Sequence, residues 1–394
     1  MLSALLKPKA SKLFLLGIIL LLAVFLLPNK IPKKNQQIDP QSVQTIRQIA
    51  KNINEACTMA NAQCYQQKIT QDLLNKYPTY QILEAIYDYD TYFSCHAFTH
   101  FLGRALYQET QSIPDAYSQI NFTCHGGSYH GVIEAYLERS NWQKNPKDIN
   151  LESVCQDSKT KTDKNPQAVF QECLHGFGHA FMFVTNSDLP QSLLLCDQLK
   201  KELQEICWGG ALMENSTSST NLDHPTQWLK KDDKFFPCTI LSEKYLNQCY
   251  FYQANYLIMT TNYDFQKVFE DCYTLVESEL NYCIMGIGAI LASVSNEQGI
   301  KKAAEVCAIG KESVQTICIE GAVPSLMQRH GGEMSKIIEF CKSVTSHLQE
   351  HCFAKLGKIS KNWHTQEQLE KLCQNADIYK DTCLDRSNIK LLYN

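Results

Sequence analysis

The sequence predicts an all-α protein: disulfide-clipped helical hairpins that form an α-solenoid or superhelix, preceded by one N-terminal transmembrane helix. Three observations support this prediction. The cysteines recur at a regular spacing, the segments between them carry helical apolar patterns with few strand signals, and one uninterrupted apolar run lies near the N-terminus. Together they indicate a right-handed superhelix of about eight or nine hairpins.

The chain has 394 residues, with 37 Lys+Arg against 41 Asp+Glu and a formal net charge of −4. This balance argues against an electrostatic nucleic-acid binder, which usually carries a basic surplus. A mean hydropathy of −0.28 excludes a polytopic membrane protein. The 18 cysteines are an even count and far more than a reduced cytosolic protein tends to keep. We therefore expect a folded protein in an oxidising space, the periplasm or the cell exterior.

The apolar run near the N-terminus starts at Leu13 and reaches 19 residues when it is extended through Ile31. That length is close to the ~20 residues that span a bilayer. No small-x-small cleavage site follows, so we expect a signal-anchor over 13–31 in preference to a cleaved signal peptide. Residues 1–12 are then cytoplasmic, and the polar segment 32–48 is a linker. The cysteines place the bulk of the chain on the oxidising side of this single-pass anchor.

A repeat is visible in the cysteine spacing of the region 191–394. Two cysteines stand 10 or 11 residues apart six times, and the first members of these pairs recur about every 34 residues. A period near 34 is typical of stacked helical hairpins. We predict six disulfides: Cys196–Cys207, Cys238–Cys249, Cys272–Cys283, Cys307–Cys318, Cys341–Cys352 and Cys373–Cys383.

Each of these pairs predicts a helical hairpin. On a single helix, 11 residues would separate the two cysteines by ~16 Å, too far for a disulfide. A turn must therefore lie between them, with the first cysteine in the last turn of one helix and the second near the start of the next. Serines five to seven residues before the second cysteine are expected to cap that second helix: Ser242, Ser278, Ser313 and Ser346.

The region 49–190 shows the same organisation with looser spacing. The spacing of the remaining cysteines suggests three further pairs. Cys155 and Cys173 form a pair with a polar insert, Cys57 and Cys64 form a short pair, and Cys95 and Cys124 could bridge adjacent repeats. Sequence alone leaves these three connections open.

Between residues 150 and 390, the period and the hairpins resemble the cysteine-stapled two-helix repeats of the Sel1-like and tetratricopeptide type. The Leu-Gly-x-x-Tyr pattern of Sel1-like repeats does not recur regularly, so the resemblance is architectural. It implies a curved helical solenoid of the kind that often serves as a protein-binding scaffold. The resemblance implies no catalytic residue in this chain.

Six of the 11 histidines fall between residues 96 and 179 and follow the cysteines of three successive repeats: His96 and His100, His125 and His130, His175 and His179. Pairs at i and i+4 project from one helical face, and imidazole is a ligand for zinc, copper and iron. The middle pair is five apart, and Gly126 with Gly127 indicates that His125 precedes its helix. We predict a multi-histidine transition-metal site at these six residues, with a dinuclear site as one form of it.

Neighbouring groups extend this prediction. Glu134 and Glu214 are candidate catalytic residues that could complete the ligand set or act as a base, and Tyr129 is a further candidate. Non-covalent haem is an alternative cofactor, whereas covalent c-type haem is excluded because no Cys-x-x-Cys-His occurs. A structural network of hydrogen-bonded histidines, or a metal-free catalytic or ligand cleft, would also explain the repetition.

Two functions from different classes follow. The first is a membrane-anchored extracytoplasmic metalloprotein, with a metal-dependent enzyme as its stronger form. The second is a non-catalytic scaffold that binds a protein, peptide or glycan while the histidines serve structure. No nucleic-acid partner is expected. Four aromatic residues on one segment are expected in the core, with an exposed binding stripe as the alternative: Tyr250, Phe251, Tyr252 and Tyr256.

Overall fold

The computed structural model describes residues 39–57, 61–87, 92–140, 150–159, 165–217 and 226–384. All regular secondary structure in these ranges is helical, as predicted. The expected signal-anchor 13–31 and the expected cytoplasmic residues 1–12 lie outside them. The chain divides into two compact units, Met1–Ser42 and Val43–Asn394, and apart from the first residues of α2 the described helices belong to the second unit.

Shorter and longer helices alternate along this unit. Its first part holds α2 (Pro40–Ala56), α3 (Ala62–Lys68), a π-helix (Ile69–Leu74), α4 (Thr79–Ile86), α5 (Tyr92–Thr110), α6 (Ile113–Gln119), α7 (Gly127–Arg139), α8 (Leu151–Ser158) and α9 (Pro166–Val184). The second part holds α10 (Leu189–Cys196), α11 (Lys201–Thr217), α12 (Glu243–Thr260), α13 (Phe265–Cys272), α14 (Glu277–Gln298), α15 (Ile300–Val306), α16 (Glu312–Arg329), α17 (Met334–Ser343), α18 (Ser346–Ser360), α19 (Gln366–Cys373) and α20 (Lys380–Cys383), with 3₁₀ turns at Cys307–Ile309 and Gln374–Tyr379.

Two segments bear on the expected membrane attachment. Because α2 begins at Pro40, the second half of the segment 32–48, expected to be a linker, is helical. Among the described residues, one stretch in α14, Glu277–Ser295, is long and apolar enough by length and composition to cross a membrane, and 61% of it is buried inside the fold.

The cysteine pairs clip helical hairpins as the spacing predicted. In the hairpins α10–α11, α13–α14 and α17–α18, the first cysteine lies in the last turn of the shorter helix and the second lies within the first half of the longer one. All 18 cysteines are paired, with Cα atoms 5.4–5.9 Å apart. The six predicted disulfides are present, and the three open connections are Cys57–Cys64, Cys95–Cys124 and Cys155–Cys173. Nine disulfides indicate an oxidising, extracytoplasmic environment.

Two details of the hairpin prediction are wrong. Ser242 stands at the N-cap of α12, but the other three serines lie inside the first turn of their helices: Ser278 in α14, Ser313 in α16 and Ser346 in α18. Glutamates at the first position of α14 and α16 favour the earlier start, because negative charge is stabilised at a helix N-terminus. Cys238 is the second exception, since residues 226–242 form turns and bends in place of a first helix.

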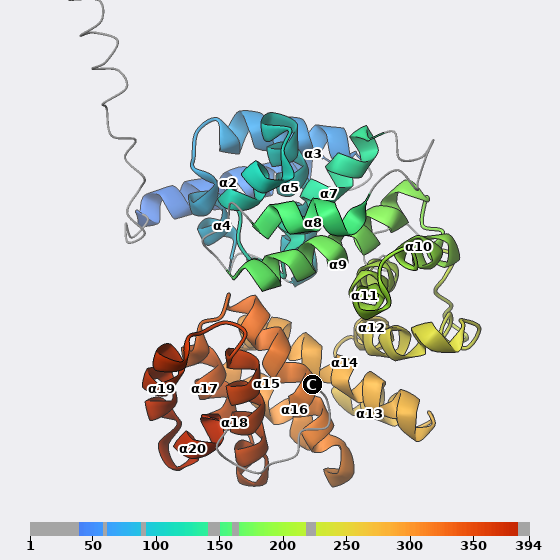
Figure 1. Cartoon of the computed structure of the whole chain (residues 1–394), viewed down its shortest axis with the longest axis vertical. Coiled ribbons are helices and arrows are strands. Elements are labelled where there is room, and N and C mark those ends of the chain that lie inside the picture. The colour runs from blue at the N-terminus through green and yellow to red at the C-terminus, as the bar shows by residue number, and fades with distance from the viewer. Residues whose placement is uncertain are drawn as a thin grey trace, which may run out of the picture. The chain divides into compact units, whose positions relative to one another are not determined.

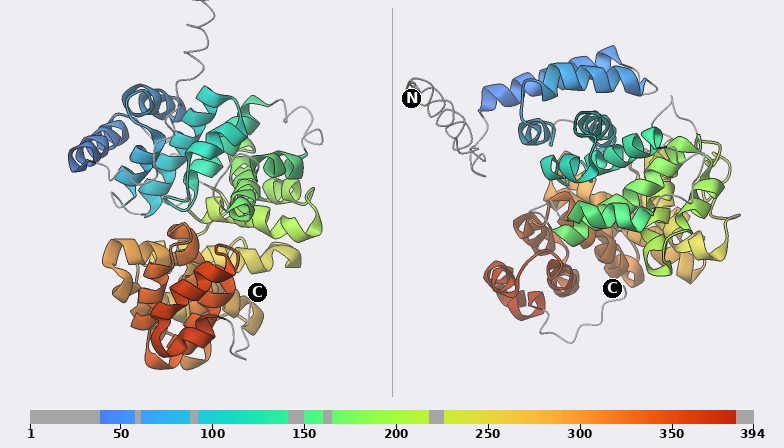
Figure 2. Two further views of the ribbon diagram at one scale, coloured as in Figure 1. Left: turned by 60° about the vertical axis from the view of Figure 1, so that its left-hand side comes forward. Right: turned by 45° about the horizontal axis from the view of Figure 1, so that its top comes forward.

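The longer helices pack against one another in chain order, from α5 through α7, α9, α11, α12, α14 and α16 to α18 (Figures 1 and 2). Glycine permits the close approach of α9 and α11. A Cβ atom at Gly178 would overlap the carbonyl oxygen of Cys207, and one at Gly210 would overlap that of His175. The backbones of the hairpins therefore lie close together at the level of the histidines.

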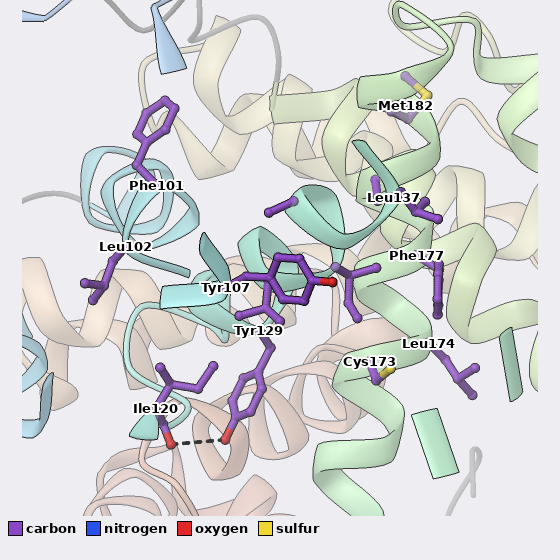
Figure 3. Packing of buried hydrophobic residues seen from close by; sticks show 14 of the residues in the cluster. Phe101, Leu102, Tyr107, Ile120, Tyr129, Leu137, Cys173, Leu174, Phe177 and Met182 are labelled. Carbon is purple, nitrogen blue, oxygen red and sulfur yellow. Dashed lines mark hydrogen bonds between the residues drawn. The ribbon is translucent and has the colours of Figure 1, made fainter. Parts of the chain in front are cut away.

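An apolar core holds the histidine-bearing helices α5, α7 and α9 in place (Figure 3). Leu102, Leu137 and Phe177 contribute to it from the three helices and are fully buried. Tyr129 belongs to the same core, and its hydroxyl donates to the carbonyl oxygen of Ile120 at 3.5 Å, as Figure 3 shows. Tyr129, which the sequence made a candidate site residue, therefore packs in the core.

The array of helices curves back on itself, so that its C-terminal hairpins contact its N-terminal ones. The hydroxyl oxygen of Tyr87 lies 2.8 Å from Nδ1 of His330. The ring centroids of Phe122 and Trp363 are 5.4 Å apart. Two side-chain hydrogen bonds join the same regions: Gln328 donates to Glu172, and Asn165 donates to the carbonyl oxygen of Asn362. These contacts close the array, and the predicted solenoid or superhelix is not confirmed.

Candidate metal centre

Four histidines from three helices meet at one point. His96 and His100 lie on α5, His130 on α7 and His179 on α9, and one ring nitrogen of each lies within 4.8 Å of those of the others. Their ring centroids are 4.3–5.9 Å apart. All four residues are buried, with at most 9% of each residue exposed. We call these residues the four-histidine group.

The helical register brings the rings together in pairs. His96 and His100 are one turn apart on α5, and their Nε2 atoms lie 3.0 Å from each other. His175 and His179 have the same relation on α9, with their Nε2 atoms 3.2 Å apart. The ring of His130 stacks on that of His179 and thereby joins α7 to the second pair.

The outer nitrogen of three rings is held by an oxygen acceptor. Nδ1 of His96 lies 2.7 Å from the carbonyl oxygen of Cys124. Nδ1 of His100 lies 2.6 Å from Oε1 of Glu134, and Nδ1 of His179 lies 2.7 Å from Oε2 of Glu214. Because these oxygens accept hydrogen bonds, Nδ1 carries the proton of the neutral ring and Nε2 keeps its lone pair. Metal-ligating histidines are almost always held in this way.

Opposed Nε2 lone pairs require a positive charge between them. At 3.0 Å in the first pair, two lone pairs that face each other repel. The same holds at 3.2 Å in the second pair when the backbone hydrogen bond to Ile206 takes the ring proton of His175. Two nitrogen ligands at ~2.0–2.1 Å from a tetrahedral zinc ion lie ~3.3 Å apart. The observed separations are close to that value, so either a shared proton or a shared metal ion would satisfy each pair.

His130 offers its other nitrogen. Its Nε2 lies 3.1 Å from Oε2 of Glu172. Its Nδ1 is buried and has no hydrogen-bond partner among the described residues. A buried polar atom without a partner costs about 1–3 kcal/mol, and a bound cation would remove that cost. Nδ1 is therefore the candidate ligand atom of His130.

The other two predicted ligands lie outside the four-histidine group. His175 adjoins it through His179, and its half-buried side chain borders a large cavity. His125 lies in the loop before α7 with a φ of 53°, and it borders the same cavity. His125 precedes its helix, as Gly126 and Gly127 indicated in the sequence, because the positive φ of Gly126 delays α7 until Gly127. The i and i+4 pairs are those of α5 and α9.

Burial keeps most of these imidazoles neutral. It lowers the pKa of His96 and His130 well below the usual value and that of His179 to about 3, with the neighbouring histidines adding to the effect. For His100, burial alone would lower the pKa, but the carboxylate of Glu134 raises it. Neutral imidazole is the form that binds metal ions.

Glu134 and Glu214, the candidate catalytic residues, lie on the Nδ1 side of the rings. Glu134 also accepts from Nη1 of the buried Arg104 at 3.3 Å. Burial alone would raise the pKa of Glu134, but His100 and Arg104 lower it to about 2. Neither carboxylate is among the residues that line the cavity. Their positions indicate that these two carboxylates orient the histidine rings and do not react with a substrate directly.

Glu172 is a site residue that the sequence reasoning missed. It is 5% exposed, lies between His130 and Gln328, and lines the cavity. Burial raises the pKa of its carboxyl to about 8, and the hydrogen bond from Gln328 opposes that shift. Its signal in the sequence was slight, a single acid directly before Cys173 in a mostly apolar helix.

A cavity of about 770 Å³ adjoins the four-histidine group and is lined by residues of α9, α11, α12, α14, α16 and α18. Its volume lies within the range of small-molecule sites. His175 and Glu172 line it and also contact the group, so they lie between the candidate metal centre and any ligand in the cavity.

Comparison with known proteins identifies no relative of this chain: no family model, no curated protein and no solved structure matches it. Function is therefore inferred from the geometry of the site alone.

Proposed function

We propose that the protein is an extracytoplasmic metalloprotein that binds one divalent transition-metal ion through the four-histidine group. The observation that carries this proposal is the pair His96/His100, whose Nε2 atoms face each other at 3.0 Å while both Nδ1 atoms meet oxygen acceptors. Imidazole ligands suit zinc, copper and iron. A single ion fits better than non-covalent haem, since neighbouring rings such as those of His130 and His179 stack directly on each other.

His175 and Glu172 support a catalytic form of this proposal. A bound ion would polarise a carbonyl group or activate a water molecule. His175 borders the cavity and would orient a substrate there. Glu172, whose raised pKa of about 8 keeps it protonated at neutral pH, would give up and take back a proton at Oε2, which is 3.1 Å from His130. We assign this role to Glu172 in preference to Glu134 and Glu214, whose carboxylates bind the outer nitrogens of the rings.

The compartment forms part of the same proposal. Nine disulfides support an oxidising environment. We propose that residues 13–31 attach the chain to the membrane as a single-pass signal-anchor with residues 1–12 in the cytoplasm. Protease treatment of intact cells tests this topology: a tag at the N-terminus should be protected, while the disulfide-bonded region should be accessible from the other side.

A non-catalytic scaffold is the second candidate, because the same hydrogen bonds also join neighbouring helices. His96 connects α5 to the loop before α7, His100 connects α5 to α7, and His179 connects α9 to α11. A structural network would need these contacts and no metal. The protein would then bind a protein, peptide or glycan partner without a reaction.

Metal content distinguishes the two candidates. Full-length protein produced in an oxidising compartment and purified without chelator is analysed by mass spectrometry of its metals. We expect bound metal in the wild type, loss of that metal in His179→Ala, and retention in His347→Ala, which removes an exposed histidine of α18 whose Nε2 lies 2.7 Å from Oε1 of Gln315 on α16. A folded wild type that takes up no zinc, copper or iron on dialysis would refute the metalloprotein proposal and favour the scaffold.

A further inference from the structure

The lining of the cavity is chemically distinct from the four-histidine group. Most of its polar side chains are amides or hydroxyls, among them Asn165, Gln171, Gln248, Asn255, Ser325 and Asn362. Aromatic rings also line the cavity, including those of Tyr252 and Trp363. A cavity of about 770 Å³ with these groups is large enough for a ligand of drug size or above.

Among the described residues that line the cavity there is no lysine or arginine, so they offer a ligand no permanent cation. Of the cavity's two buried carboxyl groups, one is neutralised by a lysine and the other is bonded to an amide and a neutral imidazole. Glu320 is fully buried and accepts from Nζ of Lys355 at 2.8 Å, and Glu172 accepts from Gln328. The third carboxylate, Glu205, is exposed to solvent. An anionic ligand would be desolvated without a partner, and a cation would find no unpaired buried carboxylate, so a neutral ligand is favoured.

Recognition in this cavity relies mainly on side chains. Most of its walls are the sides of helices, whose backbone N–H and C=O groups are bonded within each helix, while residues such as His125, Asn362 and Trp363 lie in the segments between helices. Extended peptides are commonly recognised through the backbone of a sheet edge, which these walls do not offer. A lipid would bury the amides without hydrogen bonds. Hydroxyl groups, which both donate and accept, are complementary to side-chain amides.

Aromatic rings supply the apolar part of the surface. Phe251 and Tyr252 of α12 lie with their centroids 4.9 Å apart, and Trp363, after α18, lies 5.4 Å from Phe122. Gly209 leaves room for Tyr252, because a Cβ atom there would lie 3.1–3.2 Å from its ring and hydroxyl. The C–H face of a pyranose ring stacks on aromatic rings of this kind, while its hydroxyls point outward to the amides.

We propose that the cavity binds a neutral oligosaccharide, with sugar rings stacked on Tyr252 and Trp363 and hydroxyls bonded to amides such as Gln248 and Asn255. This inference goes beyond the metal centre and does not depend on it. In the catalytic form of the proposed function, a saccharide of this kind is the substrate class, and Glu172 lies at the end of the cavity that adjoins the metal ligands.

Binding of hexasaccharides to the full-length chain tests this proposal. Chitohexaose, cellohexaose and mannohexaose are the neutral probes, hexagalacturonate is the anionic probe, and binding is measured by saturation-transfer NMR and calorimetry. We expect at least one neutral probe to bind, and Tyr252→Ala and Trp363→Ala each to weaken its affinity roughly tenfold. Tyr80→Ala is the matched control, because Tyr80 is 37% exposed and lies outside the cavity.

A second variant fills the cavity and guards against misfolding of the aromatic variants. Ala289 of α14 lines the cavity and is half-buried, so Ala289→Trp should abolish binding while circular dichroism remains native. The proposal is overturned if no neutral probe binds the folded wild type, if only hexagalacturonate or a peptide library binds, or if binding survives Ala289→Trp. The same samples are assayed with and without metal, so failure of sugar binding and failure of metal binding are recorded separately.

Discussion

Residues two positions after a hairpin cysteine have opposite surroundings in the two halves of the molecule. His175 follows Cys173 in the first half, Glu320 follows Cys318 in the second half, and both line the cavity. Glu320 is neutralised within the protein by Lys355 at 2.8 Å. The Nε2 atom of His175 instead faces another imidazole nitrogen at 3.2 Å. The second half thus supplies its own cation, whereas the first half brings imidazole nitrogens together in a way that a shared proton or a metal ion would satisfy.

The largest effect is expected when Lys355, the cation that neutralises Glu320 in the second half, is removed. In Lys355→Met, the fully buried Glu320 loses its ammonium partner and keeps the imidazole of His351 at 2.9 Å, and we expect the free energy of unfolding to fall by about 3–5 kcal/mol. Urea denaturation followed by circular dichroism measures this change. The double variant Glu320→Gln/Lys355→Met removes both charges and should recover most of the loss. A loss below about 1 kcal/mol in the single variant, the size of an exposed ion pair, would contradict the comparison.

The next largest effect is the stabilisation expected when a zinc ion is added to the four-histidine group in the first half. Free zinc at about 100 times its dissociation constant should stabilise the metal-free wild type by about 2.7 kcal/mol against unfolding. His179→Ala lacks one ligand of the four-histidine group and should gain little. The Glu320→Gln/Lys355→Met variant should gain as much as the wild type. Thermal unfolding with and without zinc measures all three, and equal stabilisation of His179→Ala would show that zinc binds elsewhere.

A smaller effect is expected from a residue that orients a metal-binding histidine without binding the metal itself. Glu134 holds Nδ1 of His100 at 2.6 Å, so Glu134→Gln should weaken metal binding by about 10–100-fold without abolishing it. Glu138→Gln is the control, because Glu138 pairs with Arg104 but is half-exposed and contacts no histidine of the group. Competition with a chromophoric zinc chelator gives both affinities. An unchanged affinity in Glu134→Gln would remove this carboxylate from the metal centre.

The smallest expected effect concerns the contact that closes the array. Burial, together with Arg329, lowers the pKa of His330 from its usual 6.5 to about 4. Its contribution to stability is therefore complete above the unfolded pKa of 6.5 and is lost as the pH falls towards about 4, because the unfolded chain takes up the proton first. His330→Gln should make the unfolding midpoint less dependent on pH across this window. Equal pH dependence in the two proteins would show that His330 remains unshifted.

The hairpins could be predicted from sequence because the disulfide that clips each one is a local constraint. Cys272 and Cys283 are 11 residues apart, and only a turn between them brings their Cα atoms to 5.9 Å. The closure of the array could not be predicted in this way. The contact of Tyr87 with His330 spans 243 positions and depends on the sum of small rotations between successive hairpins, which no local pattern records.

In the candidate metal centre too, contacts between residues close in sequence could be predicted, and contacts between residues far apart in sequence could not. His96 and His100 share a helix, so their spacing predicted that their rings would meet. His125 was expected beside them, but the turn through Gly126 directs the chain differently before α7 starts. Glu172 could not be found from sequence, since its partner Gln328 lies 156 positions away and its neighbour His130 lies on another helix.

The closure of the array also bears on how such a protein can change in length. An open repeat protein can gain or lose a unit at either terminus, and its end units fray first. Here Tyr87 and His330 join distant hairpins, and the cavity depends on walls from both halves. Deleting one hairpin would separate these contacts and open the cavity in a single step. The number of repeats is therefore constrained by geometry. A chain shortened by one hairpin should lose the folded unit as a whole and should not keep part of its binding function.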